Sequence, residues 1–173
     1  MKKLTTRDLT RMALMTAIAC VLSIITLPLG PVPLTLSVLA VFLVGALLPP
    51  LQAMTTLWAY VLLGLAGLPV YAGMASGLGV VLGPTGGYLL SYPFMALVFS
   101  LMCRRRVLWQ SILGIPLAIV LCHGVGSLWY SAVTHVPLAQ TFAACSLPFL
   151  LPDLLKGAAA LLLSRAVPRS LLS

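Results

Sequence analysis

Charged residues occupy only a few short segments of this 173-residue chain, and the long stretches between them are apolar. Charged side chains make up 7% of the sequence and hydrophobic side chains 61%. A soluble domain carries roughly 25% charged residues. So few charges cannot cover a surface that faces water, and the sequence therefore predicts an integral membrane protein.

The apolar residues are spread along the whole chain, which predicts an all-α bundle of transmembrane helices. The strands of an outer-membrane barrel would alternate apolar and polar residues, and this sequence lacks that alternation. One membrane span takes about 20 residues. We therefore expect a single domain, residues 1–173, that contains several spans.

Proline and glycine divide the apolar sequence into six predicted spans. The first begins after a positively charged segment, as a signal peptide does, but its apolar stretch is long and no A-x-A-like cleavage site ends it, so we expect it to be retained. The last is expected to be bent, because Pro148 and Pro152 lie inside it. The predicted spans cover about residues 9–27, 34–48, 51–65, 87–103, 108–133 and 142–167.

Basic residues fall where a six-span chain would expose them on one side of the membrane. Nine of the ten flank the predicted spans in three clusters, and the connections after the first, third and fifth spans contain no Lys or Arg. The positive-inside rule then places both termini in the cytoplasm. The net charge of +8 does not indicate nucleic-acid binding, because the basic residues lie at predicted membrane edges without interleaved aromatic residues. The clusters are Lys2, Lys3, Arg7 and Arg11, then Arg104, Arg105 and Arg106, then Arg165 and Arg169.

The stretch "LLPDLLKGAAALLL", residues 150–163, places Asp153 and Lys156 inside the last predicted span. An ionisable residue inside a span costs about 2.5–3.5 kcal/mol on insertion scales. Residues at i and i+3 share one face of a helix, so these two charges can partly offset each other. Pro152 fits the first turn of a helix, which would place Asp153 in that turn, near the positive end of the helix dipole.

Two interpretations of this pair remain open. The pair can be a structural staple that caps the helix and holds the bundle. It can also be a ligand site that faces the bundle interior, where charges inside a membrane usually lie. An acceptor beside a donor complements a ligand with N–H groups next to a carbonyl, such as a cyclic urea.

A segment with eight glycines, residues 64–87, is too broken to form a regular span. Irregular backbone at membrane depth occurs only where it is buried in protein or lines a cavity. We expect a re-entrant segment that either packs or contacts a ligand, with Tyr71 and Tyr88 flanking it. The turn "PLGPVPLT", residues 28–35, is either a lid over the outer mouth or an ordinary connection.

Other features of the sequence are less specific. Ala13 and Ala17 form a small-xxx-small face that allows another helix to approach closely. The sequence has no P-loop and no H-x-x-x-H pair, so we expect no ATPase centre and no metal site. The four cysteines are interpreted as small buried hydrophobes, and His123 as a packed residue rather than a catalytic one.

Three segments, in this order, resemble the BioY family, the biotin-specific S components of energy-coupling factor (ECF) transporters. They are "PLGPVPLTL", "YVLLGLAGLPVYAGMASGLGVVLGPTGGYLL" and "LPFLLPDLLK". The resemblance extends from about residue 7 to residue 166. It implies a six-helix S-component fold in the cell membrane that captures biotin from outside, with biotin as transported ligand and no cofactor. It also implies partners, namely a transmembrane coupling subunit and a pair of cytoplasmic ATPases, and an S component that topples in the membrane to release the vitamin inward.

The resemblance also implies roles for single residues. Asp153 and Lys156 match the family's D-x-x-K and would hold the ureido ring of biotin, and Tyr88 would line the pocket. Small residues of the first span, here Ala13 and Ala17, would contact the coupling subunit.

Two loops complete the implied site. Residues 71–76 match a loop that contacts the ligand, which includes Tyr71, Gly73 and Ser76. Some family members carry an Asn near Gly73, whereas this chain has "AGMASG", so that contact is either missing or made by Ser76 or the backbone. The outer loop around Pro33 and Thr35 would close over the site.

Two alternatives to a biotin carrier remain. One is an S component for another vitamin, because a shared fold does not determine the ligand. The other is a small membrane enzyme or a structural bundle partner. An enzyme would need a nucleophile and a base, and no such pair is found, since Asp153 is the only carboxylate expected inside the membrane.

Overall fold

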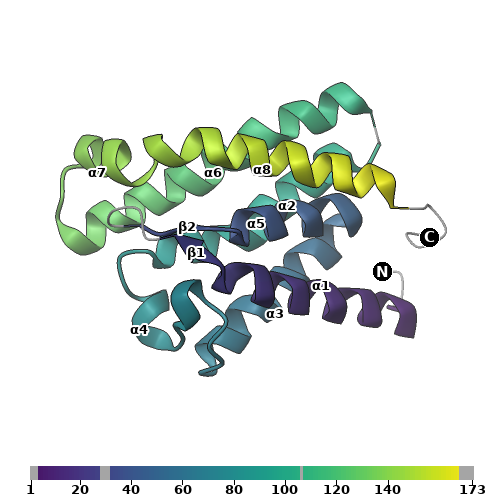
Figure 1. Ribbon diagram of the computed structural model, residues 1–173, viewed down its shortest axis with the longest axis horizontal. Coiled ribbons are helices and arrows are strands. Elements are labelled where there is room, and N and C mark those ends of the chain that lie inside the picture. Colours follow the sequence, from purple (N-terminus) through teal and green to yellow (C-terminus); the bar gives the residue numbers. More distant parts are fainter. Residues whose placement is uncertain (1–3, 28–31, 106, 168–173) are drawn as a thin grey trace.

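Helices make up most of the chain in the computed structural model, which describes residues 4–27, 32–105 and 107–167 (Figure 1). This is expected for a chain in lipid, because a helix satisfies its backbone hydrogen bonds within its own segment. The elements are α1 Thr6–Ile24, β1 Thr26–Leu27, β2 Leu34–Thr35, α2 Ser37–Leu47, α3 Pro50–Leu65, the 3-10 turn η1 Ala72–Met74, α4 Leu78–Val81, α5 Gly86–Cys103, α6 Leu108–Thr134, α7 Leu138–Cys145 and α8 Leu147–Ala166.

Helix α1 begins with a capping box and ends earlier than predicted. The Thr5 side chain accepts a hydrogen bond from the Asp8 N–H at 3.2 Å, and the Asp8 carboxylate accepts one from the Thr5 N–H at 2.9 Å. The first span was predicted to end at about Leu27, whereas α1 ends three residues earlier, at Ile24, and β1 follows. Leu27 precedes a proline in the sequence, and a residue in that position disfavours the helical conformation.

Strands β1 and β2 form a short antiparallel pair, with Thr26 opposite Thr35 and Leu27 opposite Leu34. The pair lies between α1 and α2, and β2 forms the end of the turn, residues 28–35, that we interpreted as either a lid or a connection. Residues 28–31 of that turn lie outside the described residues.

Helix α5 lies in the middle of the bundle and packs against α2, α3 and α6, while α2 also packs against α8. Phe42 of α2 and Phe99 of α5 are fully buried, and their rings meet edge to face with centroids 4.8 Å apart. Met95 and Ala96 of α5 are also fully buried. The core therefore runs along one side of α5 and fixes the helices that surround it.

The polarity of the bundle is the reverse of that of a soluble protein. Large apolar side chains point outward from α6 and α8, including Leu117 and Val120 on α6 and Leu155 and Leu162 on α8. Serine and threonine side chains are buried instead, and Ser100 donates a hydrogen bond to the Leu48 carbonyl at 2.6 Å. An outer surface of this kind fits lipid, so the chain is a membrane protein.

Not every helix is long enough to cross a bilayer alone. Among the described residues, α5, α6 and α8 are the helices with the length and apolar composition of a span. At about 1.5 Å per residue, α2 and α3 reach only about 16 Å and 24 Å, against a hydrocarbon core of about 30 Å. The fold class is therefore a mostly helical membrane protein, and the count of six spans remains a prediction.

The elements separate into two ends of the molecule (Figure 1). The start of α1, the end of α8 and the connection between α5 and α6 lie at one end, where the sequence places its basic residues. The β1–β2 pair, α4 and α7 lie at the other end. Between the end of α3 and the start of α5, the glycine-rich segment contains η1 and α4 as regular structure, and its re-entrant character remains a prediction.

The last predicted span is two helices rather than one bent helix. Helix α7 ends at Cys145, and α8 begins at Leu147 with Pro148 in its first turn, where a missing N–H has no cost. The prediction that Pro152 and Asp153 occupy the first turn is therefore wrong, because both lie one turn further along α8. Pro152 is inside the helix and leaves the Pro148 carbonyl without its usual N–H partner.

Candidate ligand-binding site

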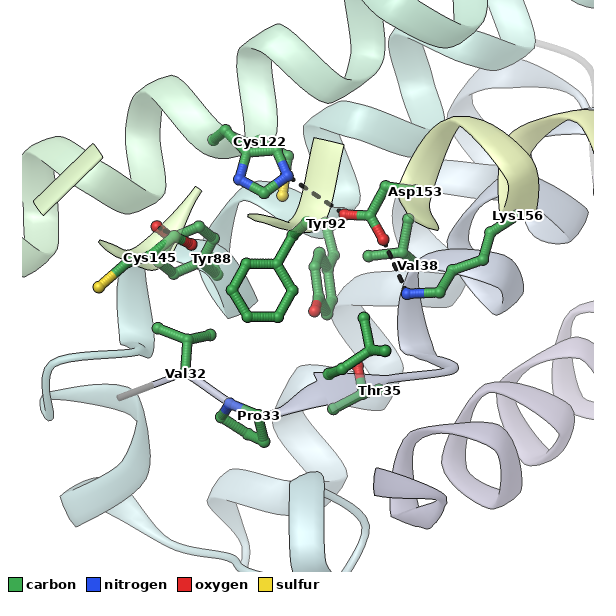
Figure 2. A pocket seen from close by; sticks show the side chains of 13 residues that line it. Val32, Pro33, Thr35, Val38, Tyr88, Tyr92, Cys122, Cys145, Asp153 and Lys156 are labelled. Carbon is green, nitrogen blue, oxygen red and sulfur yellow. Dashed lines mark hydrogen bonds and ion pairs between the residues drawn. The ribbon is translucent and has the colours of Figure 1, made fainter. Parts of the chain in front are cut away.

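A cavity lies between residues 32–35, which include strand β2, and helices α2, α5, α6, α7 and α8 (Figure 2). In Figure 2, Val32, Pro33 and Thr35 lie across the cavity from Asp153 and Lys156. Its volume is about 40 Å³, well below the roughly 300–1,000 Å³ of typical ligand pockets, so a wall must move to admit a ligand. The cavity is lined by Val32, Pro33, Leu34, Thr35, Val38, Tyr88, Tyr92, Cys122, His123, Cys145, Phe149, Asp153 and Lys156.

Asp153 is the charged centre of this cavity. The residue is 4% exposed, and each of its carboxylate oxygens has a separate partner. Oδ1 accepts from the Lys156 ammonium at 2.7 Å, and Oδ2 lies 3.2 Å from Nε2 of His123. The predicted spacing of Asp153 and Lys156 on one helix face is confirmed, and the pair faces the bundle interior. Removing either charge would leave the other buried without compensation.

His123 belongs to this cluster, which sequence reasoning missed. It was interpreted as a residue packed in its span, and it is indeed buried, at 4% exposure. Its Nε2 contacts Asp153, and its Nδ1 has no hydrogen-bond partner among the described residues. A lone histidine in an apolar helix does not reveal a partner 30 positions away, so only the packing of α6 against α8 shows the contact.

Tyr88 lines the cavity and is held by polar groups at its far end. Its hydroxyl donates to the Cys145 carbonyl at 3.1 Å and lies 3.0 Å from Oγ of Ser146, which lies 2.7 Å from Oγ of Ser127. Its ring meets the His123 imidazole edge to face, with centroids 5.8 Å apart. Three helices are therefore joined at one wall of the cavity.

Tyr92, which was not predicted, connects the cavity to the strand pair. Its hydroxyl lies 2.9 Å from Oγ of Ser37 at the start of α2, and Ser37 also contacts the Thr35 hydroxyl. Thr35 and Pro33 both line the cavity. This hydrogen-bonded chain ties strand β2 to helices α2 and α5.

The amino-acid sequence matches the BioY family over residues 1–173. The chain belongs to the BioY family.

Relatives of the BioY family cover nearly the same length. The chain is 33% identical to the probable biotin transporter BioY of Pyrococcus horikoshii, over 91% of this chain and 94% of that protein. It is 34% identical to biotin transporter BioY2 of Lactococcus lactis, over 95% of this chain and 91% of that protein. It is 35% identical to biotin transporter BioY of Thermotoga maritima, over 91% and 94% of the two chains.

The fold matches a solved structure described as the S-component for biotin from an ECF-type ABC transporter. The TM-score is 0.86 at 26% sequence identity, and the match covers 94% of this chain and 93% of the other. The S-component fold predicted from the BioY resemblance is therefore confirmed.

Three residues that the BioY resemblance placed at the ligand are not among those that line the cavity, namely Tyr71, Gly73 and Ser76. The Tyr71 hydroxyl donates to the Val61 carbonyl at 2.5 Å, and its ring packs against Gly64. Gly73 is exposed, with a φ of 64°. Their contact with a ligand stays a prediction, which in this arrangement would require the glycine-rich segment to shift.

The cavity offers hydrogen-bonding groups in an apolar setting. The carboxylate of Asp153 has lone pairs to spare, Lys156 has N–H donors, and one nitrogen of His123 is unoccupied. Among residues 4–27, 32–105 and 107–167, no three His, Cys, Asp or Glu side chains are grouped as metal ligands. The arrangement suits a small polar ligand with an apolar body.

Proposed function

We propose that this protein is a biotin-specific S component, which captures biotin at the outer face of the cell membrane. The observation that carries the proposal is the buried Asp153–Lys156 pair, which lines a cavity in a member of the BioY family. Support comes from relatives named as biotin transporters and from the similarity to an S-component for biotin.

In the proposed complex, the urea ring of biotin lies against the charged pair. A urea N–H donates to the Asp153 carboxylate, and the Lys156 ammonium donates to a ligand oxygen. The side chains of the two residues are only 6% and 12% exposed, and hydrogen bonds to charged groups in such a setting are stronger than neutral ones. The apolar part of biotin packs against Tyr88 and Tyr92.

Biotin enters, in this proposal, by displacement of the β1–β2 pair. The cavity is small, so one wall has to open, and each strand of this pair has only two residues. Its side chains are partly exposed, with no fully buried residue in either strand. Few buried contacts make a segment the easiest to displace.

Orientation and partners belong to the same proposal. We infer six spans with both termini in the cytoplasm of a multi-pass plasma-membrane protein, because the basic residues collect at one end of the bundle. Transport then requires an ECF coupling subunit and a pair of cytoplasmic ATPases. Ala13 and Ala17 support a contact with the coupling subunit, because both are exposed on α1.

The deciding experiment is a biotin titration of the purified protein in lipid nanodiscs. We expect Asp153→Asn to weaken binding by about tenfold or more, equivalent to roughly 1.4 kcal/mol, because the Lys156 charge then loses its partner. Asp8→Asn is the matched control, since Asp8 is the other acidic residue of the chain and lies in the α1 capping box. The affinity of the Asp8→Asn variant for biotin is expected to equal that of the wild type.

Unchanged affinity in Asp153→Asn would reject the site. A wild-type protein that ignores biotin but binds another labelled vitamin in a competition panel would reject biotin as the ligand. It would favour an S component of different specificity.

A further inference from the structure

His123 is a buried side chain with only half of its hydrogen-bonding capacity used. The histidine side chain is 6% exposed and lines the cavity. Its Nε2 contacts Asp153, whereas its Nδ1 has no hydrogen-bond partner among the described residues. A buried polar atom without a partner destabilises a fold, so such an atom on a residue that lines a cavity marks a place where a ligand can bind.

The neighbours of His123 determine which hydrogen bond Nδ1 can make. An ionised carboxylate only accepts, so the nitrogen that faces Asp153 carries the hydrogen. Lys156 already balances the Asp153 charge, and the other titratable side chains in the lining are Tyr88, Tyr92, Cys122 and Cys145, which carry no charge in their protonated forms. A second proton on the imidazole would leave a buried positive charge without compensation. The Nδ1 atom is therefore an acceptor.

We propose that His123 is a third polar ligand group of the cavity, whose Nδ1 accepts a hydrogen bond from an N–H of the ligand. Asp153 and His123 then accept from two different N–H groups, while Lys156 donates to an oxygen. This arrangement selects a cyclic urea with both nitrogens unsubstituted. The inference rests on the proposed function and adds to it a determinant of specificity on α6.

Two substitutions of His123 separate a ligand contact from a purely structural role. The amide nitrogen of glutamine takes the place of Nε2 and keeps a donor toward Asp153. The amide oxygen of asparagine takes the place of Nδ1 and keeps an acceptor. We expect His123→Gln to weaken biotin binding by about tenfold and His123→Asn to bind within about threefold of the wild type. His135→Gln is the matched control, because His135 is exposed at the end of α6.

A ligand-side measurement completes the test. Biotin methylated at one or the other urea nitrogen is titrated against the wild type and against His123→Gln. We expect both methylated ligands to lose affinity for the wild type by about tenfold, because each lacks one of the two donated N–H groups. The ligand methylated at the nitrogen that faces His123 is expected to bind His123→Gln as tightly as biotin binds that variant, because the acceptor for that N–H is already gone.

The opposite pattern would overturn the inference. If His123→Gln binds like the wild type and His123→Asn does not, the imidazole acts only through Asp153. If methylation weakens binding to His123→Gln by the same factor as binding to the wild type, Nδ1 does not contact that N–H. A wild-type protein that does not bind biotin would instead reject the proposed function itself, and the two failures are thus distinguishable.

Discussion

The position of Tyr88 depends on the absence of a side chain at Gly126. A Cβ atom at residue 126 would lie 2.3 Å from the Tyr88 ring, closer than real Cβ contacts allow. Tyr88 in turn lines the cavity and holds the Ser146 hydroxyl. A single methyl group on α6 would therefore change the shape of the cavity without touching its charged groups.

We expect Gly126→Ala to weaken biotin binding by about tenfold, because the Tyr88 ring must leave its position. The control is Gly124→Ala, on the same helix, where a Cβ would meet nothing within 4 Å. Titration of both variants in nanodiscs checks the expectation. Equal affinities for the two variants would show that the position of the Tyr88 ring does not matter for binding.

At the scale of single residues, the contacts that could be predicted were those between residues close together in the sequence. Asp153 and Lys156 are three positions apart, so helical geometry alone places them on one face, and the structure confirms their contact. The contact of Asp153 with His123 spans 30 positions, and that of Tyr92 with Ser37 spans 55. Such pairs depend on how helices pack, which the spacing of residues does not encode.

Among the elements, the glycine-rich segment after α3 packs back onto α3 through the Tyr71 side chain. The Tyr71 ring lies against Gly64, where a Cβ would be 2.2 Å from the ring, and its hydroxyl donates to the Val61 carbonyl. The backbone carbonyl of Gly64 also accepts from the N–H groups of Gly67 and Gly77. Gly64 is therefore the point at which the segment folds back onto α3.

We expect Gly64→Ala to lower the free energy of unfolding by about 1–3 kcal/mol, the usual cost of overpacking a buried site. Tyr71→Phe should cost less, about 0.5–1.5 kcal/mol, because it removes only one hydrogen bond. Thermal unfolding of the purified protein measures both. Gly79→Ala is the control, since a Cβ there meets nothing within 4 Å, and a loss of stability in that variant as large as in Gly64→Ala would contradict this explanation.

Element boundaries were predicted well where the prolines allow one helix start and poorly where they allow two. Pro49 and Pro50 separate α2 from α3 as expected. Near the last span, both Pro148 and Pro152 suit a first helical turn, and the structure uses Pro148. The prediction therefore placed Asp153 one turn too early, although its partner on the same face was correct.

At the scale of the whole molecule, the exposed face of α1 is the surface expected to meet the coupling subunit. We expect Ala13→Trp to prevent co-purification with the coupling subunit and the ATPases, because the indole blocks the close approach of a second helix. Biotin binding by the isolated protein should not change, since Ala13 does not line the cavity.

Val120→Trp provides the control for this substitution, because Val120 is an exposed apolar residue on α6. Co-purification of each variant with tagged ATPases measures assembly. If Ala13→Trp assembles as well as Val120→Trp, the partner contacts a different surface.

Membrane insertion could be predicted from composition alone, because so few charges exclude a water-facing surface. The length of individual helices could not. Residues 34–48 form one apolar stretch, yet Leu34 and Thr35 belong to β2 and α2 begins only at Ser37. Hydropathy does not distinguish a residue that continues a helix from one that pairs in a strand.

The hydroxyl groups of Tyr88, Ser127 and Ser146 join α5, α6 and the junction of α7 with α8 at one wall of the cavity, whereas residues 32–35, which include the short strand β2, form another wall. The two walls therefore differ in what they can tolerate. Extra atoms attached to the ligand would be accommodated where they emerge past the strands, and would be rejected where they press on the joined helices. A vitamin conjugated through its chain would still dock if that chain points toward the strands, while one enlarged at the opposite end would be excluded on size.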